Sequence, residues 1–480
     1  MLAAGLIRWK IIALVLGPVG VGIAGVIDQA AQVVLQLGTL NIPTAALRFL
    51  AIARESRGLD GFAWLFRTLR RVLLLATGLA ALLAFAIYFV WPDTLGAGMG
   101  AYRWAVLLAL AAVPATAAIN LLRNVLATVD HHQEVAITLL VSSVLLAAGT
   151  AAGLALDGLR GAYLAALLVA VWTVWVLQRR LRPSLKGARV EDAGSLGAFL
   201  RSHTTVVRFS LTLYAVGFTV PLGYAVLRWT VLGQLGEQEA GFLAAAFTIA
   251  MGVRATFTAA STQYLLPRTS RDRSPAERAA EVARYIRTLL LLLVLAGLPL
   301  QLYPRELLVT LYSREFVAAT DVIGIFILGE IVMAIGDAYR VLQLGLDDLV
   351  GYFLTTSGAV VLVALNAGWV VSAHGLHGAA VLQVAAALAA LMWSIGRIRF
   401  RHGIRTDWRT MLATIYAIGA LAVATLIGRA SPETALTNIA LKAAAGAILL
   451  LVAWMTLPAA ERAGVIASLP AIRRSGPRGP

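Results

Sequence analysis

Long runs of apolar residues, separated by short polar or basic stretches, repeat along the whole chain. A helix needs about 20 residues to cross a bilayer, and by that measure the runs predict about 14 transmembrane helices. The runs are too long for strands and show no period-two alternation, so we expect an all-α membrane protein whose first helix is short. The expected ranges are 1–16, 19–46, 72–91, 103–128, 135–156, 161–178, 205–228, 240–264, 287–304, 317–343, 350–372, 376–396, 409–428 and 436–457.

Composition supports a lipid environment. Apolar residues make up 60% of the 480 residues and charged residues only 13%, against about half and about a quarter in soluble proteins. A soluble fold of this length could not cover so much apolar surface. The net charge of +16 does not indicate a nucleic-acid partner, because the arginines recur between apolar runs instead of forming one patch. The absence of cysteine excludes disulfides and thiolate chemistry.

The distribution of arginine and lysine predicts the orientation. Basic residues concentrate after the second, sixth, eighth and twelfth expected helices and in the tail, whereas the other connections carry scattered ones such as Arg160. By the positive-inside rule, both termini are expected in the cytoplasm. The opposite connections are all short, so they leave no room for an extracytoplasmic catalytic domain, and we expect a protein that is not an enzyme.

An internal repeat relates the two halves of the chain. Its glycine turns lie after helices one and seven and before helices six and twelve, and an arginine lies near the inner ends of helices four and ten. The pairs are Gly17 and Gly236, Gly158 and Gly375, and Arg123 and Arg340, separated by 219, 217 and 217 residues. Glycine turns also recur by chance in helical membrane proteins, but the common offset favours two six-helix bundles of the same orientation, as in repeat-built transporters.

The repeat predicts the domain organisation. We expect a six-helix lobe over 1–182, a basic cytoplasmic linker over 183–204 and a second six-helix lobe over 205–400. Two extra helices over 409–457 and a cytoplasmic tail over 458–480 follow them. Because rocking of two such bundles exposes a central cleft to alternate sides, this design predicts a carrier.

Ionisable residues inside the expected spans are the candidate site, because their burial in lipid is costly. The candidate cations form a ladder along the expected cavity, which suits an anionic substrate since arginine binds phosphate oxygens bidentately. The acids could balance an empty site or carry protons. The candidate cations are Lys10, Arg123, Arg254 and Arg340, and the candidate acids and amides are Asp28, Gln32, Gln36, Glu330 and Asp337.

Each candidate also has a structural interpretation. Arg123 and Arg340 could extend to the inner interface. Asp337 and Arg340 are three residues apart and could simply pair. Asp28 could begin a stripe, at four-residue spacing, that hydrogen-bonds neighbouring helices. Arg254 is too deep in its helix to reach the interface freely, which favours a position lining a cavity.

Four segments resemble Wzx-type lipid-linked oligosaccharide flippases, in particular those for O-antigen and enterobacterial common antigen, of the multidrug/oligosaccharidyl-lipid/polysaccharide exporter superfamily. The segments are Lys10–Gly25 with Gln29, Tyr264–Arg271, Phe316–Ala319 with Gly329 and Glu330, and Ala373–Ala379. The resemblance covers roughly residues 10–400.

The resemblance implies two six-helix lobes in a V and movement of undecaprenyl-pyrophosphate-linked oligosaccharide units from the inner to the outer leaflet of the bacterial cytoplasmic membrane. It assigns Lys10 and Arg254, with Arg123, to a cationic cavity. This chain departs from the family pattern at Asp28, where some relatives carry a basic residue. A polysaccharide polymerase and a chain-length regulator are the implied protein partners. No cofactor is expected, and no nucleotide-binding G-x-x-x-x-G-K-[ST] loop is present, so an ion gradient or the membrane potential would drive alternation.

Two related carriers remain as alternatives. A lipid II flippase would share the cationic cavity. A drug/cation antiporter of the same superfamily would favour acids over a deep arginine, so Arg254 argues against it. A membrane polymerase or ligase would need larger outer loops.

Overall fold

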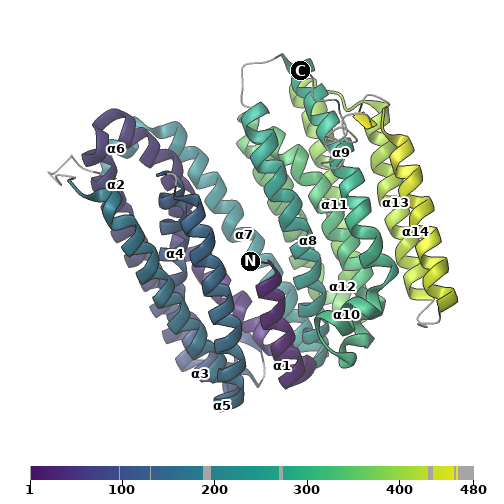
Figure 1. Cartoon of the computed structure of the whole chain (residues 1–480), viewed down its shortest axis with the longest axis horizontal. Coiled ribbons are helices and arrows are strands. Elements are labelled where there is room, and N and C mark those ends of the chain that lie inside the picture. The colour runs from purple at the N-terminus through teal and green to yellow at the C-terminus, as the bar shows by residue number, and fades with distance from the viewer. Residues whose placement is uncertain are drawn as a thin grey trace, which may run out of the picture. The chain divides into compact units, whose positions relative to one another are not determined.

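The computed structural model describes residues 2–96, 98–129, 131–187, 196–269, 274–430, 436–458 and 461–462, and over these residues the chain is helical without strands (Figure 1). The all-α prediction is confirmed. The α-helices are α1 (Leu2–Thr39), α2 (Ile42–Val90), α3 (Arg103–Ala111), α4 (Val113–Ala127), α5 (His132–Leu181), α6 (Leu196–Ser202), α7 (Thr204–Leu235), α8 (Glu237–Thr269), α9 (Pro275–Leu302), α10 (Pro304–Leu311), α11 (Thr320–Gly345), α12 (Leu349–His402), α13 (Trp408–Ala430) and α14 (Leu436–Thr456). Four short 3₁₀ turns join them: η1 (Pro92–Leu95), η2 (Met99–Tyr102), η3 (Arg182–Leu185) and η4 (Arg314–Ala319).

Several of the long helices reverse direction at a glycine. In α5 the backbone is interrupted at Gly158, where φ is 57°. Ser142 and Thr173 of this helix are hydrogen-bonded at 2.8 Å, although 31 residues of straight helix would separate them by roughly 45 Å. The two halves therefore lie side by side. Gly17 in α1 and Gly375 in α12 have nearly the same backbone angles, φ 63° and 59°.

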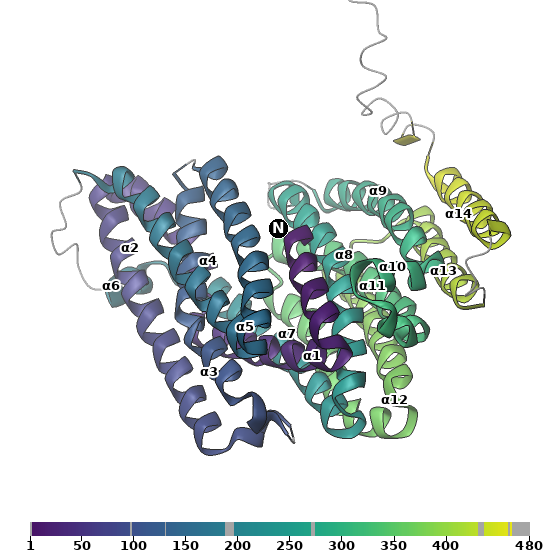
Figure 2. The ribbon, with the colours of Figure 1, turned by 60° about the horizontal axis from the view of Figure 1, so that its bottom comes forward.

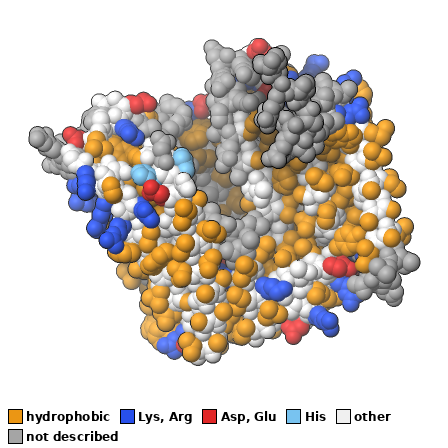
Figure 3. Space-filling view, in the orientation of Figure 1, with side chains coloured by type: hydrophobic (Ala, Val, Ile, Leu, Met, Phe, Trp, Pro, Cys, Tyr) orange, Lys and Arg blue, Asp and Glu red, His pale blue; other side chains and the backbone are white. Residues whose placement is uncertain are grey.

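The described residues contain eleven helical stretches long and apolar enough to cross a membrane. Three of these stretches, 5–39, 132–185 and 349–402, contain the reversals at Gly17, Gly158 and Gly375, and each therefore forms two antiparallel segments. Counted this way, the described residues contain fourteen apolar helical segments, the number expected from the apolar runs, and the chain is a multi-pass membrane protein. Figure 3 shows apolar side chains along the visible helix flanks, with many of the charged side chains near the helix ends.

Some helix boundaries differ from those expected. The second helix was expected to reach residue 46, but α1 ends at Thr39 because Leu40 and Asn41 adopt left-handed conformations, and α2 then starts with Pro43 in its first turn. Conversely, α9 begins at Pro275, not at 287, with a capping box between Ser274 and Glu277. Hydropathy marks only the part of a helix that lies in lipid, so charged ends that continue the helix escape it.

Parts of the basic connections lie outside the described residues. These parts are 188–195 of the expected linker with Arg189, 270–273 with Arg271 and Arg273, and most of the expected tail with Arg473, Arg474 and Arg478. On the described side of the linker, residues 196–202 form the short helix α6.

The described chain divides into two compact units. Unit 1 comprises Met1–Ala245, Leu311–Phe316 and Val360–Leu376, and unit 2 comprises Ala246–Thr310, Val317–Ala359 and His377–Pro480. The expected division into lobes at 182 and 205 remains a prediction.

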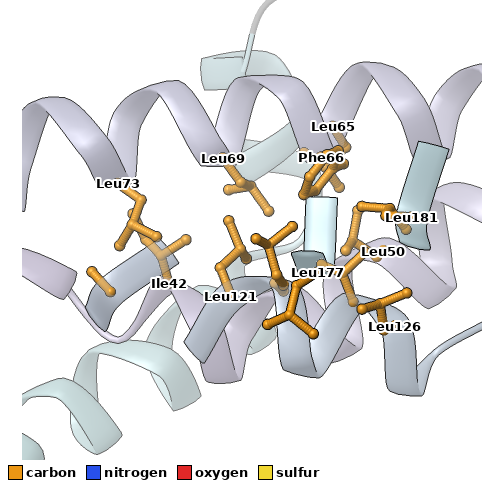
Figure 4. Packing of buried hydrophobic residues seen from close by; sticks show 14 of the residues in the cluster. Ile42, Leu50, Leu65, Phe66, Leu69, Leu73, Leu121, Leu126, Leu177 and Leu181 are labelled. Carbon is orange, nitrogen blue, oxygen red and sulfur yellow. The ribbon is translucent and has the colours of Figure 1, made fainter. Parts of the chain in front are cut away.

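A hydrophobic cluster in unit 1 joins α2, α4 and α5 (Figure 4). Leu69 of α2, Leu121 of α4 and Leu177 of α5 are buried members of it. Because lipid is as apolar as leucine, close van der Waals packing holds such helices together, and loss of water contact contributes little.

In unit 2, α13 packs on α9 and on α14, and both views show α13 and α14 adjacent (Figure 2). Close contacts at glycine bring α13 near its neighbours. A Cβ atom at Gly428 would lie 2.1 Å from the carbonyl oxygen of Gln301, and one at Gly297 would lie 2.9 Å from Leu421. The two helices that follow the expected repeat are thus packed into unit 2.

Candidate functional site

The reversal of α1 at Gly17 brings Arg8 against Asp28 within unit 1. The Arg8 Nη1 atom lies 2.8 Å from Asp28 Oδ2, and Nη2 lies 3.4 Å from Oδ1. Because the first half of α1 runs back along the second, a residue nine positions before Gly17 faces one eleven positions after it. The carboxylate of Asp28, one of the candidate acids, is therefore paired with an arginine of the first half of α1.

Tyr163 completes the surroundings of Asp28. Its hydroxyl donates to Asp28 Oδ1 at 2.8 Å and lies 3.1 Å from the carbonyl oxygen of Ala24, which brings α5 onto α1. From α7, Arg228 donates to the carbonyl oxygen of Gly25 at 2.8 Å. The Asp28 side chain nevertheless retains 31% of its exposure. This carboxylate thus has two donors and an open side from which a proton or another cation could reach it.

The other candidates in unit 1 are half-buried or exposed. Gln36 lies beside Gly217 of α7, since a Cβ atom on that glycine would be 3.4 Å from Gln36 Oε1. Gln32 and Lys10 are half-buried. Arg123 is exposed near the end of α4, and within the described chain it forms no ion pair with Asp28. Its place fits the interfacial interpretation.

In unit 2, Arg254 of α8 bridges two carboxylates of α11. Its Nε lies 3.0 Å from Asp337 Oδ2 and its Nη1 lies 3.2 Å from Glu330 Oε2. Glu330 and Asp337 are seven residues apart, two helical turns on one face, so one guanidinium can reach both. Arg254 keeps 14% of its side-chain exposure, whereas Glu330 has none.

Further polar partners hold the two carboxylates in place. Arg340 donates to Asp337 from Nε at 2.9 Å and to the carbonyl oxygen of Met333 at 2.7 Å. Thr258 also bonds to Asp337, and Gln383 of α12 donates to Glu330 at 2.7 Å. The Arg340 side chain is only 2% exposed. The pairing of Asp337 with Arg340, the structural interpretation raised from their spacing, is what the structure contains.

These contacts give a cluster of two arginines and two acids with no net charge. Neutrality is what a polar group in the membrane interior requires, because an unpaired buried charge is strongly destabilising. Arg254 is the more exposed of the two arginines and lies on a different helix from both acids. It is therefore the arginine of this cluster that can change partner with the least rearrangement.

Sequence reasoning did not single out several of the residues that shape these clusters. Arg8, Tyr163 and Arg228 in unit 1 and Gln383 in unit 2 were absent from the candidates. For Arg8 the signal was present, because reflecting the chain about Pro18, next to Gly17 in the turn, places it opposite Asp28. Tyr163, Arg228 and Gln383 had no comparable signal, since their partners lie on helices distant in sequence.

A further charged group of unit 2 lies at the two ends of α12. Asp348 caps the first turn through Gly351, and Arg397 of the returning half donates to it at 2.7 and 2.8 Å. His402 lies 3.4 Å away. Burial raises the pKa of Asp348, but the bonds from Arg397, Gly351 and His402 outweigh it and lower the pKa to about 2. This group closes the α12 hairpin and is separate from the Arg254 cluster.

The described residues contain no group of three or more histidine, aspartate or glutamate side chains that could hold a metal ion.

Curated relatives exist at low identity, although no protein-family model matches the chain. The lipid III flippase of Escherichia coli (strain K12) is 24% identical over 392 residues, which cover 79% of this chain and 90% of the relative. The lipid III flippase of Shigella flexneri matches to the same extent.

Solved structures resemble the whole fold. An inward-facing multidrug resistance MATE family transporter of the MOP superfamily matches with a TM-score of 0.69 at 15% identity, over 82% of this chain and 94% of that one. The lipid II flippase MurJ in an inward closed conformation matches with a TM-score of 0.69 at 12% identity, over 94% and 95%. The chain therefore has the all-helical fold of the MOP-superfamily transporters.

Proposed function

We propose that this protein is a flippase that moves undecaprenyl-pyrophosphate-linked oligosaccharide units from the inner to the outer leaflet by alternating access. The observation that carries the proposal is the Arg254 cluster, a partly exposed arginine held between two acids inside a membrane-spanning bundle. The similarity to lipid III flippases over 392 residues supports the class of substrate.

The chemistry of Arg254 suits a diphosphate. A guanidinium has five N–H donors in a planar fork, and phosphate oxygens accept them bidentately. A pyrophosphate that reached Arg254 would replace Glu330 at Nη1, where the contact is 3.2 Å. Glu330 would keep its bond from Gln383 and could take up a proton, which would offset one of the two negative charges of the diphosphate.

The Asp28 group in unit 1 would undergo a similar exchange, in which a proton replaces the contact with Arg8. Asp28 accepts from Arg8 and Tyr163 and remains part-exposed. Protonation of Asp28 would weaken its bond to Arg8 and leave that guanidinium able to attract an anion. We therefore assign Asp28 to coupling and Arg8, with Lys10 as a further cation, to attraction of the anionic substrate in unit 1.

The proposal includes the orientation and partners expected from sequence. Both termini would lie in the cytoplasm, and the substrate could be an O-antigen-like unit delivered to a polymerase with its chain-length regulator. In unit 1, the path would be lined by Lys10, Gln32 and Gln36, with Arg123 at its inner end. In unit 2, Arg340 would hold Asp337 in place beside Arg254.

The test is complementation in cells that lack their own oligosaccharide flippases. Surface polysaccharide and the lipid-linked intermediate left in the inner leaflet are both measured. We expect surface sugar to return and the intermediate to fall with the unchanged protein, and neither to change with Arg254→Ala. The matched control is Arg399→Ala, which removes an arginine that is exposed at the end of α12.

Other outcomes separate the alternatives. Rescue only of cells lacking a lipid II flippase would transfer the assignment to that substrate. Failure of a well-expressed protein with every lipid-linked oligosaccharide, together with proton-dependent drug efflux, would favour an antiporter. Full transport by Arg254→Ala would remove the cationic site from the mechanism.

A further inference from the structure

A cavity lies at one end of the α5 hairpin in unit 1, apart from the Asp28 group. Its volume is about 480 Å³, and its lining includes His131, Glu134, Trp175, Arg179, Arg180 and Pro183. The residues come from the start and the end of the same folded helix and from the turn that follows it. The proposed transport mechanism uses none of them.

The charged part of this cavity has a defined arrangement. Glu134 is 2.9 Å from His131 Nδ1, and the other ring nitrogen of His131 is 3.2 Å from Ser184. The Cζ atom of Arg179 lies 5.2 Å from the centroid of the Trp175 ring, while Arg180 is exposed beside it. With His131 neutral, two arginines and one glutamate leave a single net positive charge. One phosphodiester monoanion would neutralise it.

An apolar stripe leads away from the two arginines along the same helix face. Leu164, Leu168, Val171 and Trp175 are all exposed and follow one another at spacings of four, three and four residues, which places them on one side of the helix. Arg179 continues the series four residues later. Such an exposed apolar stripe within a membrane span faces acyl chains, and tryptophan at its end is typical of the interface.

The combination selects one occupant. A free phosphate ion would use the arginines and leave the stripe without a role, whereas a phospholipid would use both at once. Basic pockets beside transmembrane helices at the cytoplasmic side bind anionic lipid head groups, and the arginine-rich connections predict that this end of α5 is cytoplasmic. We infer that the cavity binds the head group of a phospholipid with one net negative charge, of the phosphatidylglycerol class, whose chain lies along the stripe from Trp175 to Leu164.

The experiment is native mass spectrometry of the purified full-length protein with palmitoyl-oleoyl phosphatidylglycerol. The double variant Arg179→Gln/Arg180→Gln should retain this lipid about tenfold less than the unchanged protein, the effect of losing roughly 1.4 kcal/mol of binding free energy. Its matched control is Arg67→Gln/Arg71→Gln. That control removes two exposed arginines from α2, next to Leu69, which packs in the same cluster as Leu177.

Three comparisons can overturn the inference. Equal loss of lipid from both double variants would mean non-specific attraction to a basic surface. Equal retention of phosphatidylethanolamine would remove the charge argument. Displacement of the lipid by inorganic phosphate or glycerophosphoglycerol, which lack acyl chains, would reassign the cavity to a free anion. A thermal melt of each variant verifies folding, and flippase complementation is read separately, so failure of either proposal leaves the other standing.

Discussion

Gly22 and Gly241 each pack against the first turn of the helix segment that carries the other. A Cβ atom at Gly22 would lie 2.3 Å from the carbonyl oxygen of Glu237, and one at Gly241 would lie 2.0 Å from the carbonyl oxygen of Pro18. The contact is reciprocal, and each glycine lies five residues after a glycine of the repeated turns, Gly22 after Gly17 and Gly241 after Gly236. Small residues allow helix backbones to approach closely in membranes, so these glycines set the distance between α1 and the start of α8.

Replacement of Gly241 by alanine should therefore destabilise unit 1. The added methyl group would overlap the backbone of Pro18, and overpacking of this kind costs about 1–3 kcal/mol. The control is Gly233→Ala in α7, where a Cβ atom meets nothing within 4 Å. Thermal unfolding in detergent should show a lower midpoint for Gly241→Ala and an unchanged or higher one for Gly233→Ala. Equal midpoints would contradict the close contact.

Because the Arg254 cluster is neutral, substitutions of Asp337 and Arg340 should have non-additive effects on stability. Asp337→Asn or Arg340→Met alone leaves the buried cluster with one uncompensated charge, which costs about 3–5 kcal/mol. The double variant leaves Arg254 with Glu330 and restores neutrality, so it should lose less stability than the two single losses added together. A double-mutant cycle from thermal or denaturant unfolding measures the difference. Simple additivity would show that Asp337 and Arg340 do not act as a pair.

Asp28 provides a prediction about transport. Asp28→Asn keeps the shape of the side chain and removes the charge that Arg8 and Tyr163 contact. We expect the variant to insert normally and to lose transport in the complementation assay, because the proposed proton exchange requires a carboxylate. Asp157→Asn is the control, since Asp157 is an exposed acid that pairs with Arg160 beside the Gly158 turn. Normal export by Asp28→Asn would exclude the coupling role.

The pH dependence of stability should reflect Asp348. Its pKa is about 2 in the folded protein and near 3.9 in an unfolded chain. A lowered pKa stabilises the fold above the unfolded value, by about 2 kcal/mol here, and this contribution is lost as the pH falls through 2. The difference in unfolding free energy between the unchanged protein and Asp348→Asn should stay constant from pH 7 to pH 5 and shrink below pH 4.

The control for Asp348 is Glu55→Gln, because Glu55 is exposed on α2. Its unfolding free energy should match that of the unchanged protein across the same range. A difference between the unchanged protein and Asp348→Asn that persists undiminished at pH 2 would mean that packing, not charge, accounts for the effect.

The sequence by itself determined the class of fold, the number of apolar helical segments and the turns that reverse the chain. Lipid exposure forces each span to be a long apolar helix, so the pattern can be recognised in the sequence without knowledge of any tertiary contact. The repeated glycines could also be recognised in the sequence, because a reversal at positive φ favours glycine wherever it occurs. Gly17, Gly158 and Gly375 all adopt this conformation.

Only the tertiary structure decided which charges meet. Asp28, Glu330, Asp337 and Arg254 were identifiable because they interrupt apolar runs, yet their partners on helices distant in sequence were not. Arg254 reaches Asp337 across 83 residues, and Tyr163 reaches Asp28 across 135. Pairing at such separations depends on how the helices pack and rotate about their axes, which side-chain contacts between helices determine. The apolar pattern along one helix carries no information about it.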